Sequence, residues 1–187
     1  MERVLKREVL VNRTLCRLFA VVAFILLTAL AGLVRIPLPF TPVPLTLQTF
    51  FVLLAGAFLG SSLGAVTQLS YIFLGLVGLP VFSAAGSGLF YLLGPTGGYL
   101  AGFILAAFFA GRFIRYGRNL VSLFFIFSLA DLLLLSVGTL WLEFVTACSL
   151  TQAFVSGFLP FLFGDMLKAI AAAGVYLKLK NRIAEIF

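Results

Sequence analysis

Histidine is absent from this 187-residue chain, and cysteine occurs only twice. Without histidine, the chain cannot build a Ser-His-Asp triad or an HExxH zinc site. No GxxxxGK[ST] pattern is present either, so this polypeptide does not hydrolyse ATP through a P-loop. Too few cysteines and carboxylates remain for a metal site. These absences argue against an enzyme and against a metal or other cofactor, and they leave the capture and passage of a small molecule.

Charged residues are also scarce, at 10% of the chain, whereas a soluble domain has about 25%. Hydrophobic residues make up 63% of the sequence, 22 residues are phenylalanine, and the mean hydropathy is +1.20. This composition is typical of an integral membrane protein. The formal net charge of +7 does not indicate nucleic-acid binding, because the basic residues follow the ends of apolar segments and form no basic face.

Six apolar stretches are close to the length of about 20 residues that crosses a bilayer. They predict a compact all-α bundle of six transmembrane helices, in a single domain over residues 1–187. The second and third stretches are separated only by an uncharged turn at Gly60, so one kinked segment is the alternative to two helices. The expected helices cover residues 15–34, 45–59, 63–79, 95–111, 120–142 and 157–179.

The basic residues indicate the orientation of the bundle, because lysine and arginine collect on the cytoplasmic side of a membrane. With both termini cytoplasmic, eleven of the thirteen basic residues face the cytoplasm, Arg35 lies outside, and Lys168 lies within the membrane. We therefore expect a multi-pass protein of the plasma (inner) membrane. A cleaved signal peptide is the alternative for the first stretch, but this stretch continues to Val34 and is long enough to span.

Asp165 and Lys168 lie three residues apart in an otherwise apolar stretch. A charged side chain at the centre of a membrane helix costs about 2.5 to 3.5 kcal/mol on insertion scales, so such residues normally face a cavity, a partner or a ligand. The spacing of three places both on one helical face. They form either part of a ligand site or a self-satisfied ion pair that only fixes helix packing. Asp131, near the middle of the fifth stretch, has no evident partner in the sequence.

Other polar or shape-breaking residues fall at the same depth, in the outer half of the expected bundle. Four prolines between residues 36 and 44 predict a stiff, extended connection, and Gly94–Tyr99 predicts a turn followed by a helix start. Their convergence predicts a binding site, although each aromatic residue alone is also typical of a membrane interface. The candidate site residues are Arg35, Thr41, Gln48, Tyr91, Thr96, Trp141, Asp165 and Lys168.

Small residues mark the inner half of the expected bundle. Gly56 and Gly60, at a spacing of four, favour close helix contact, either with a neighbouring protein or within the bundle itself.

Five runs of sequence, in this order and spacing, resemble one family. They are IPLPFTPVPLTLQTFFVLLAGAFLG (36–60), GLVGLPVFS (75–83), LFYLLGPTGGYLAGF (89–103), GTLWL (138–142) and LPFLFGDMLK (159–168). Together they are similar to the BioY family, the biotin-binding membrane components, or S components, of energy-coupling factor vitamin transporters. The departures from the family pattern include Phe163-Gly164, which precedes the aspartate where the family commonly has Pro-Gly, and Asp131, which is not a residue associated with the family.

The resemblance implies six helices, both termini cytoplasmic, and a vitamin pocket in the outer half. It also implies a cytoplasmic surface that docks a transmembrane coupling protein, which carries two ATPase subunits. The expected function is that of a high-affinity biotin-binding subunit for biotin uptake, surrounded by membrane lipid and energised by ATPases on other chains, with no nucleic-acid partner. The alternatives are an S component for another small vitamin or precursor, and an assembly subunit that binds no small molecule.

The resemblance also implies roles for the candidate residues. Asp165 and Lys168 are expected to bind the polar head of biotin, and Tyr91 and Trp141 to surround its apolar part, together with Phe90. The biotin carboxylate is expected near the mouth, at Arg35, at Thr41 or at the N–H groups that begin the fourth helix.

Overall fold

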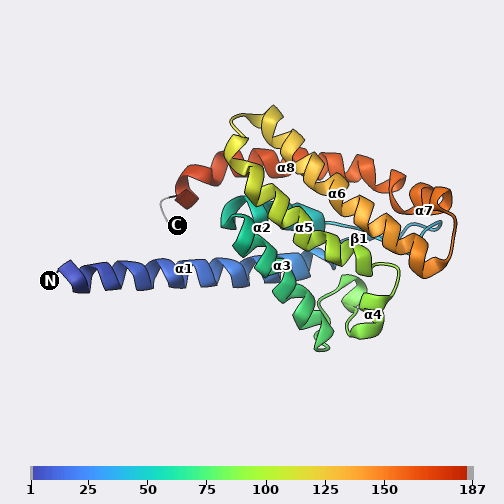
Figure 1. The fold of residues 1–187 in the computed structure, drawn as a ribbon, viewed down its shortest axis with the longest axis horizontal. Helices are drawn as coiled ribbons and strands as arrows, with labels where there is room; N and C mark the ends of the chain where they lie inside the picture. Colours follow the sequence, from blue (N-terminus) through green and yellow to red (C-terminus); the bar gives the residue numbers. More distant parts are fainter. Residues whose placement is uncertain (1, 185–187) are drawn as a thin grey trace.

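The computed structural model describes the backbone of residues 2–184 and the side chains of residues 13–181. The described chain is almost entirely helical (Figure 1), with two short 3-10 turns at Ser83–Ala85 and Ile114–Tyr116. Its α-helices are α1 (Glu2–Ala31), α2 (Gln48–Leu59), α3 (Ser61–Leu76), α4 (Leu89–Leu93), α5 (Gly97–Phe113), α6 (Leu120–Thr146), α7 (Leu150–Gly157) and α8 (Leu159–Ala184).

The expected count of six helices was too low, because eight α-helices lie within residues 2–184. The six expected stretches correspond to α1, α2, α3, α5, α6 and α8. The two additional helices, α4 and α7, have 5 and 8 residues and are too short for a search based on membrane-spanning length. A capping box marks the start of α7, where the Ser149 hydroxyl accepts a hydrogen bond from the Gln152 N–H and the Gln152 side chain accepts one from the Ser149 N–H.

Four helical segments of the described chain are long and apolar enough to cross a membrane: Arg13–Ala31, Gly97–Tyr116, Leu120–Thr146 and Leu150–Asn181. The helices α2 and α3 are shorter, with 12 and 16 residues. They are separate helices and not one kinked segment, because Gly60 adopts a left-handed φ of 81° between them. The protein is therefore an all-α, multi-pass membrane protein in which two of the expected spans are short.

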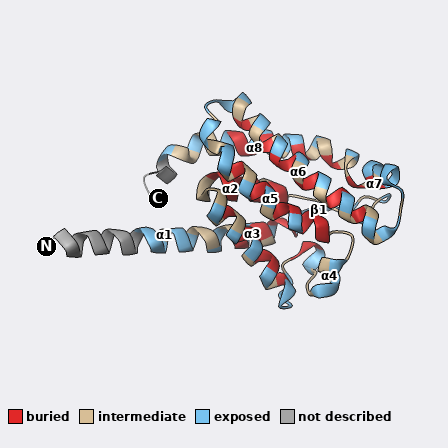
Figure 2. Ribbon diagram, in the orientation of Figure 1, coloured by how far each residue is buried: buried red, intermediate tan, exposed pale blue. Residues whose placement is uncertain are grey.

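Helix α5 lies inside the bundle and contacts α2, α3 and α6, while α8 packs against α2 and α6, and α1 against α2 and α3. Figure 2 shows the buried residues where these helices face one another, and exposed residues on the outward faces. Many exposed residues are large and apolar: Phe19, Phe73, Phe125 and Phe163 are between 59% and 75% exposed. Such faces are expected where lipid, and not water, surrounds the helices.

Successive long helices run back and forth, so that the ends of the bundle differ (Figure 1). The start of α1, the α2–α3 turn, the α5–α6 connection and the end of α8 lie on the left of the view. The Pro-rich connection, α4 and α7 lie toward the right. The Pro-rich connection is not helical, as expected, but it is not extended throughout: it turns at residues 39–40 and folds back into an antiparallel pair of short strands, β1 (Arg35–Ile36) and β2 (Leu45–Thr46).

Glycines allow α2, α3 and α5 to approach at backbone distance. A Cβ atom on Gly56 would overlap the backbone of Ala107 in α5, and one on Gly64 in α3 would lie 2.8 Å from the Gly56 Cα. A Cβ atom on Gly111 would overlap the backbone at Gly60 and Ser61. The sequence left open whether these small residues contact a neighbouring protein or other helices of the bundle. The structure shows contact within the bundle.

We expect Gly56→Ala to destabilise the protein by about 1 to 3 kcal/mol, because the added methyl group must push α5 away from α2. The matched control is Gly174→Ala in α8, where no atom beyond the backbone of its own helix lies within 4 Å of the added Cβ atom and alanine is the better helix former. Thermal unfolding in detergent checks this difference. Equal melting temperatures for the two variants would contradict the close contact of α2 and α5.

Candidate ligand-binding site

Helix α8 carries Asp165 and Lys168 on one face, and the two side chains form an ion pair. The Lys168 Nζ atom lies 2.6 Å from the Asp165 Oδ1 atom, and the side chains are only 10% and 3% exposed. The i, i+3 spacing produces this contact, as the sequence predicted. A buried ion pair is favourable only when further hydrogen bonds satisfy its atoms.

Thr49, in the first turn of α2, supplies these further hydrogen bonds. Its Oγ1 donates to the Asp165 Oδ1 atom at 3.2 Å and accepts from the Lys168 Nζ atom at 3.0 Å. The three side chains therefore form a closed triangle that joins α2 to α8. Neither contact of Asp165 uses its Oδ2 atom, and the Lys168 ammonium has a third hydrogen beyond its two bonds.

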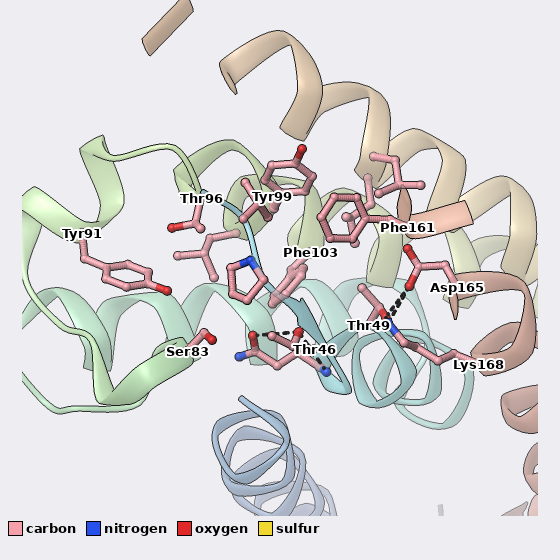
Figure 3. A pocket seen from close by; sticks show the side chains of 16 residues that line it. Thr46, Thr49, Ser83, Tyr91, Thr96, Tyr99, Phe103, Phe161, Asp165 and Lys168 are labelled. Atoms are coloured by element: carbon pink, nitrogen blue, oxygen red, sulfur yellow. Dashed lines mark hydrogen bonds and ion pairs between the residues drawn. The ribbon is translucent and has the colours of Figure 1, made fainter. Parts of the chain in front are cut away.

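All three members of the triangle line one cavity (Figure 3). Asp165 and Lys168 lie at one end, Tyr91 lies at the other, and the rings of Tyr99, Phe103 and Phe161 lie between them. The cavity thus has two polar ends, and aromatic rings line its middle together with Thr46. Its full lining is Val43, Pro44, Thr46, Gln48, Thr49, Ser83, Tyr91, Thr96, Tyr99, Leu100, Phe103, Leu134, Leu135, Phe161, Asp165 and Lys168.

A second cavity adjoins the Tyr91 end and contains Arg35. The two cavities share Pro44, Ser83, Tyr91 and Thr96 in their linings. Arg35 is exposed, and the pairing of β1 with β2 sets it opposite Thr46, which lines the first cavity. The positively charged Arg35 side chain therefore lies at the mouth, beyond the Tyr91 end of the first cavity. The ion pair lies at the other end.

Tyr91 is held in the wall between the two cavities. Its ring stacks on Phe82, with the ring centroids 5.0 Å apart, and a Cβ atom on Gly86 would overlap it. Burial raises the pKa of the Tyr91 phenol above its ordinary value, against the lowering effects of Thr96, Arg35 and Ser83. The phenol is therefore a neutral group that can donate a hydrogen bond.

The other candidate residues fall into two groups. Gln48 and Thr96 line the first cavity, but the Gln48 amide already donates to the Thr28 carbonyl at 3.3 Å and to the Tyr71 hydroxyl at 2.5 Å. Thr41 and Trp141 line neither cavity. The Thr41 hydroxyl accepts from the Val43 N–H within the Pro-rich connection.

Trp141 lies outside the cavity and packs against the Gly94–Tyr99 turn, which contributes residues to the cavity lining. Its Nε1 donates to the Gly94 carbonyl at 2.9 Å, and its side chain occupies the space where Gly98 would carry a Cβ atom. The Gly94–Tyr99 turn is therefore fixed against α6. This contact explains the glycine at position 98 and gives Trp141 a structural position outside the two cavities.

Several lining residues were not among the expected ones. Thr49 was missed because a threonine in an apolar stretch is common and gives no signal by itself. Its position directly after Gln48, where two polar residues begin an apolar helix, is the one indication in the sequence. Thr46, Ser83, Tyr99, Phe103 and Phe161 come from four different segments, and only the fold brings them together.

Comparison with known proteins then decides the family. The model of the BioY family matches residues 6–185. The chain belongs to the BioY family. It is 40% identical over 165 residues to the "Probable biotin transporter BioY" of Pyrococcus horikoshii, covering 86% of this chain and 94% of that protein. It is 38% identical over 147 residues to the "Biotin transporter BioY" of Thermotoga maritima, covering 78% of this chain and 86% of that one.

A solved structure supports the same assignment. The fold is similar, with a TM-score of 0.85 and 29% identity, to the crystal structure at 2.1 Å of "the S-component for biotin from an ECF-type ABC transporter", over 91% of this chain and 93% of that one. The resemblance read from the five sequence runs is thus confirmed. BioY proteins are transporter components, so the expectation that this chain is not an enzyme is confirmed as well.

We expect Thr49→Val to lower the free energy of unfolding by about 1.5 to 3 kcal/mol, because it removes both hydrogen bonds to charged groups and keeps the side-chain shape. Thr49→Ser keeps the hydroxyl and should stay closer to the original stability. Thr67→Val is the matched control, since the buried Thr67 hydroxyl bonds only to the Leu63 carbonyl of its own helix. Thermal unfolding without ligand measures all three, and a Thr49→Val variant no less stable than Thr67→Val would contradict the triangle.

Proposed function

We propose that this BioY protein binds biotin in the cavity between Asp165 and Arg35 and mediates its uptake across the cell membrane. The observation that carries the proposal is a buried acid and base at the end of a cavity, with a carboxylate oxygen and an ammonium hydrogen left for another molecule. A self-satisfied pair that only fixed helix packing would need no cavity beside it. The names of the relatives support the choice of biotin.

The polar head of biotin fits the ion-pair end chemically. Its ureido ring carries two N–H donors and one carbonyl acceptor. The Asp165 Oδ2 atom accepts from one N–H group, and the Lys168 ammonium donates its third hydrogen to the carbonyl. Charge-assisted hydrogen bonds of this kind are about twice as strong as neutral ones, and a buried site rejects a ligand that leaves these groups unpaired.

The apolar part of biotin fits the middle of the cavity. Its sulfur-containing ring and alkyl chain form no strong hydrogen bonds and bind best to an apolar surface. The rings of Tyr99, Phe103 and Phe161 provide such a surface. Leu134 and Leu135 of α6 also line the cavity and add apolar surface.

The carboxylate of biotin fits the opposite end. The Tyr91 hydroxyl and the Arg35 guanidinium lie on the path from the cavity to its mouth, and both donate hydrogen bonds. This assignment uses Arg35 and not Thr41, because Arg35 lines the cavity at the Tyr91 end and Thr41 lines neither cavity.

We also propose how the protein is oriented in the membrane. We infer six membrane crossings by α1, α2, α3, α5, α6 and α8, with both termini in the cytoplasm. The basic residues Arg112, Arg115 and Arg118 surround the α5–α6 connection, which lies at the same end as the start of α1 and the end of α8 (Figure 1). Val43 and Pro44 of the Pro-rich connection line the ligand cavity, and this connection lies at the opposite end (Figure 1), so we infer that biotin enters from outside.

Transport against a gradient requires an energy source on other chains, because this sequence carries no P-loop. We propose that a transmembrane coupling protein with two ATPase subunits supplies it. The described similarity to an S component of an ECF-type transporter supports this arrangement.

Two alternatives make different predictions for binding. An S component for another small vitamin or precursor would lose bound biotin to that compound in a competition experiment. An assembly subunit would co-purify with its partners and bind no small molecule.

We expect Asp165→Asn and Lys168→Met each to weaken biotin binding by at least about tenfold, since each removes a charge-assisted hydrogen bond of about 1.5 kcal/mol or more. Titration of the purified protein with biotin, by calorimetry or with radiolabelled ligand, measures the affinity. The matched control is Lys178→Met, an exposed lysine further along α8. Affinities for both site variants within twofold of the control would remove the ion pair from the site.

We expect Arg35→Gln to weaken binding of biotin but not of its methyl ester, which lacks the carboxylate charge. The loss for biotin should be about tenfold or more, the value of one charge-assisted contact. Comparing the two ligands in both proteins isolates the contact, because a general disturbance of the mouth would affect them alike. An equal loss for both ligands would place the carboxylate elsewhere.

A further inference from the structure

Ser83, in the connection between α3 and α4, carries a buried hydroxyl group without a partner. The residue is 5% exposed, and its Oγ atom forms no hydrogen bond with any described residue. Tyr91 lies on the same cavity wall, but no hydrogen bond joins the two hydroxyl groups. Burying a hydroxyl without a partner is unfavourable, so an unpaired one in a folded protein needs an explanation. One explanation is that its partner is a bound molecule.

The position of Ser83 separates it from the other unpaired groups. Among the described residues, the other side chains with a buried, unpaired polar atom are Gln68, Ser128, Asp131 and Thr139. None of these four lines either of the two cavities at the candidate site, whereas Ser83 lines both. Figure 3 shows Ser83 beside Tyr91, at the end of the first cavity away from the ion pair. Ser83 therefore lies where the two cavities meet.

The residues just before Ser83 are fixed against the bundle. Phe82 is fully buried, and its ring occupies the space where Gly75 of α3 would carry a Cβ atom. The edge of one ring faces the other where Phe82 meets Tyr71, with the ring centroids 5.7 Å apart. The Tyr71 hydroxyl also donates to the Val81 carbonyl at 3.0 Å. These contacts hold Ser83 in place before a ligand arrives, as a precise binding site requires.

The two residues after Ser83 have a strained backbone. Ala84 and Ala85 have φ of 62° and 56°, in the left-handed region that residues with a Cβ atom rarely adopt. The Gly86 N–H closes this turn by donating to the Ser83 carbonyl at 3.2 Å. Strained conformations of this kind persist where the surrounding structure holds them, and they cluster at ligand sites. The turn therefore supports a binding role for its first residue.

The charge near Ser83 indicates which part of a ligand it meets. The second cavity is lined by Arg35, and its described lining contains no acidic residue. The Arg35 guanidinium can only donate hydrogen bonds, and the Tyr91 phenol can donate one as well. A carboxylate has two oxygen atoms and about four acceptor positions, so it can accept from these two groups and from a third donor.

We propose that the Ser83 hydroxyl donates a hydrogen bond to the carboxylate of the bound ligand, at the junction of the two cavities. The donor set for the carboxylate then consists of the Ser83 and Tyr91 hydroxyl groups and the Arg35 guanidinium. Ser83 is the buried member of this set that has no other partner. This inference deepens the proposed biotin site and rests on it.

Replacing Ser83 with alanine should separate binding from folding. We expect Ser83→Ala to weaken biotin binding by about tenfold, the value of one hydrogen bond to a charged group. Its melting temperature without ligand should not fall, because the hydroxyl that is removed has no partner in the protein. Titration of the purified full chain with biotin and thermal unfolding in detergent measure the two quantities.

A control variant and a second ligand sharpen the test. The matched control is Ser136→Ala, which changes an exposed serine of α6 whose hydroxyl donates to the Leu132 carbonyl of the same helix, and it should keep the original affinity. The second ligand is biotin methyl ester, whose ester group is a neutral acceptor. Ser83→Ala should weaken binding of the ester by only about threefold, because a hydrogen bond to a neutral group contributes less.

Three results would overturn the inference. The first is a biotin affinity of Ser83→Ala within twofold of the control. The second is a melting temperature of Ser83→Ala clearly below that of the control, which would show that the hydroxyl stabilises the fold. The third is an equal loss of affinity for biotin and its methyl ester, which would place the carboxylate away from Ser83. A folded original protein that binds no biotin would instead overturn the proposed function.

Discussion

The ion pair between Asp165 and Lys168, closed by Thr49, is the interaction on which the rest of this structure depends. Lipid offers the two charges no solvation, so they persist only because they bond to each other and to a hydroxyl on a facing helix. The triangle joins α2 to α8 and leaves hydrogen-bonding capacity directed into a cavity. A purely apolar contact at this place would hold the helices equally well and would recognise nothing polar.

The scaffold brings Thr49 within reach of α8 through contacts that the small residues permit. Glycines let α2, α3 and α5 pack at backbone distance, and α2 then reaches α8 on its other side. At the mouth, the paired strands of the Pro-rich connection and the turn fixed by Trp141 hold Arg35 and Tyr91 near the cavity. Rigid elements therefore support both polar ends of the site, which favours a ligand of fixed length with a polar group at each end.

Much of this arrangement could be predicted from the sequence, and the exceptions have physical reasons. Apolar length predicted six helices to within a few residues at most ends, and the start of α1 differed because Glu2–Arg13 is polar and carries no membrane signal. The spacing of Asp165 and Lys168 predicted their contact because it is local to one helix. The contacts of Thr49 with Asp165 and Lys168 join distant segments, so the sequence gives no local signal for them. Trp141 was expected in the cavity because an aromatic residue gives the same signal whether it lines a site or packs behind it.

The most direct test of the central claim is a structure of this protein with biotin bound. The account predicts the ureido ring beside α8, with its carbonyl oxygen and one N–H group about 2.7 to 3.2 Å from the Lys168 Nζ and Asp165 Oδ2 atoms, and the carboxylate toward Arg35. Biotin bound elsewhere, or bound with Asp165 and Lys168 contacting only each other and Thr49, would contradict it.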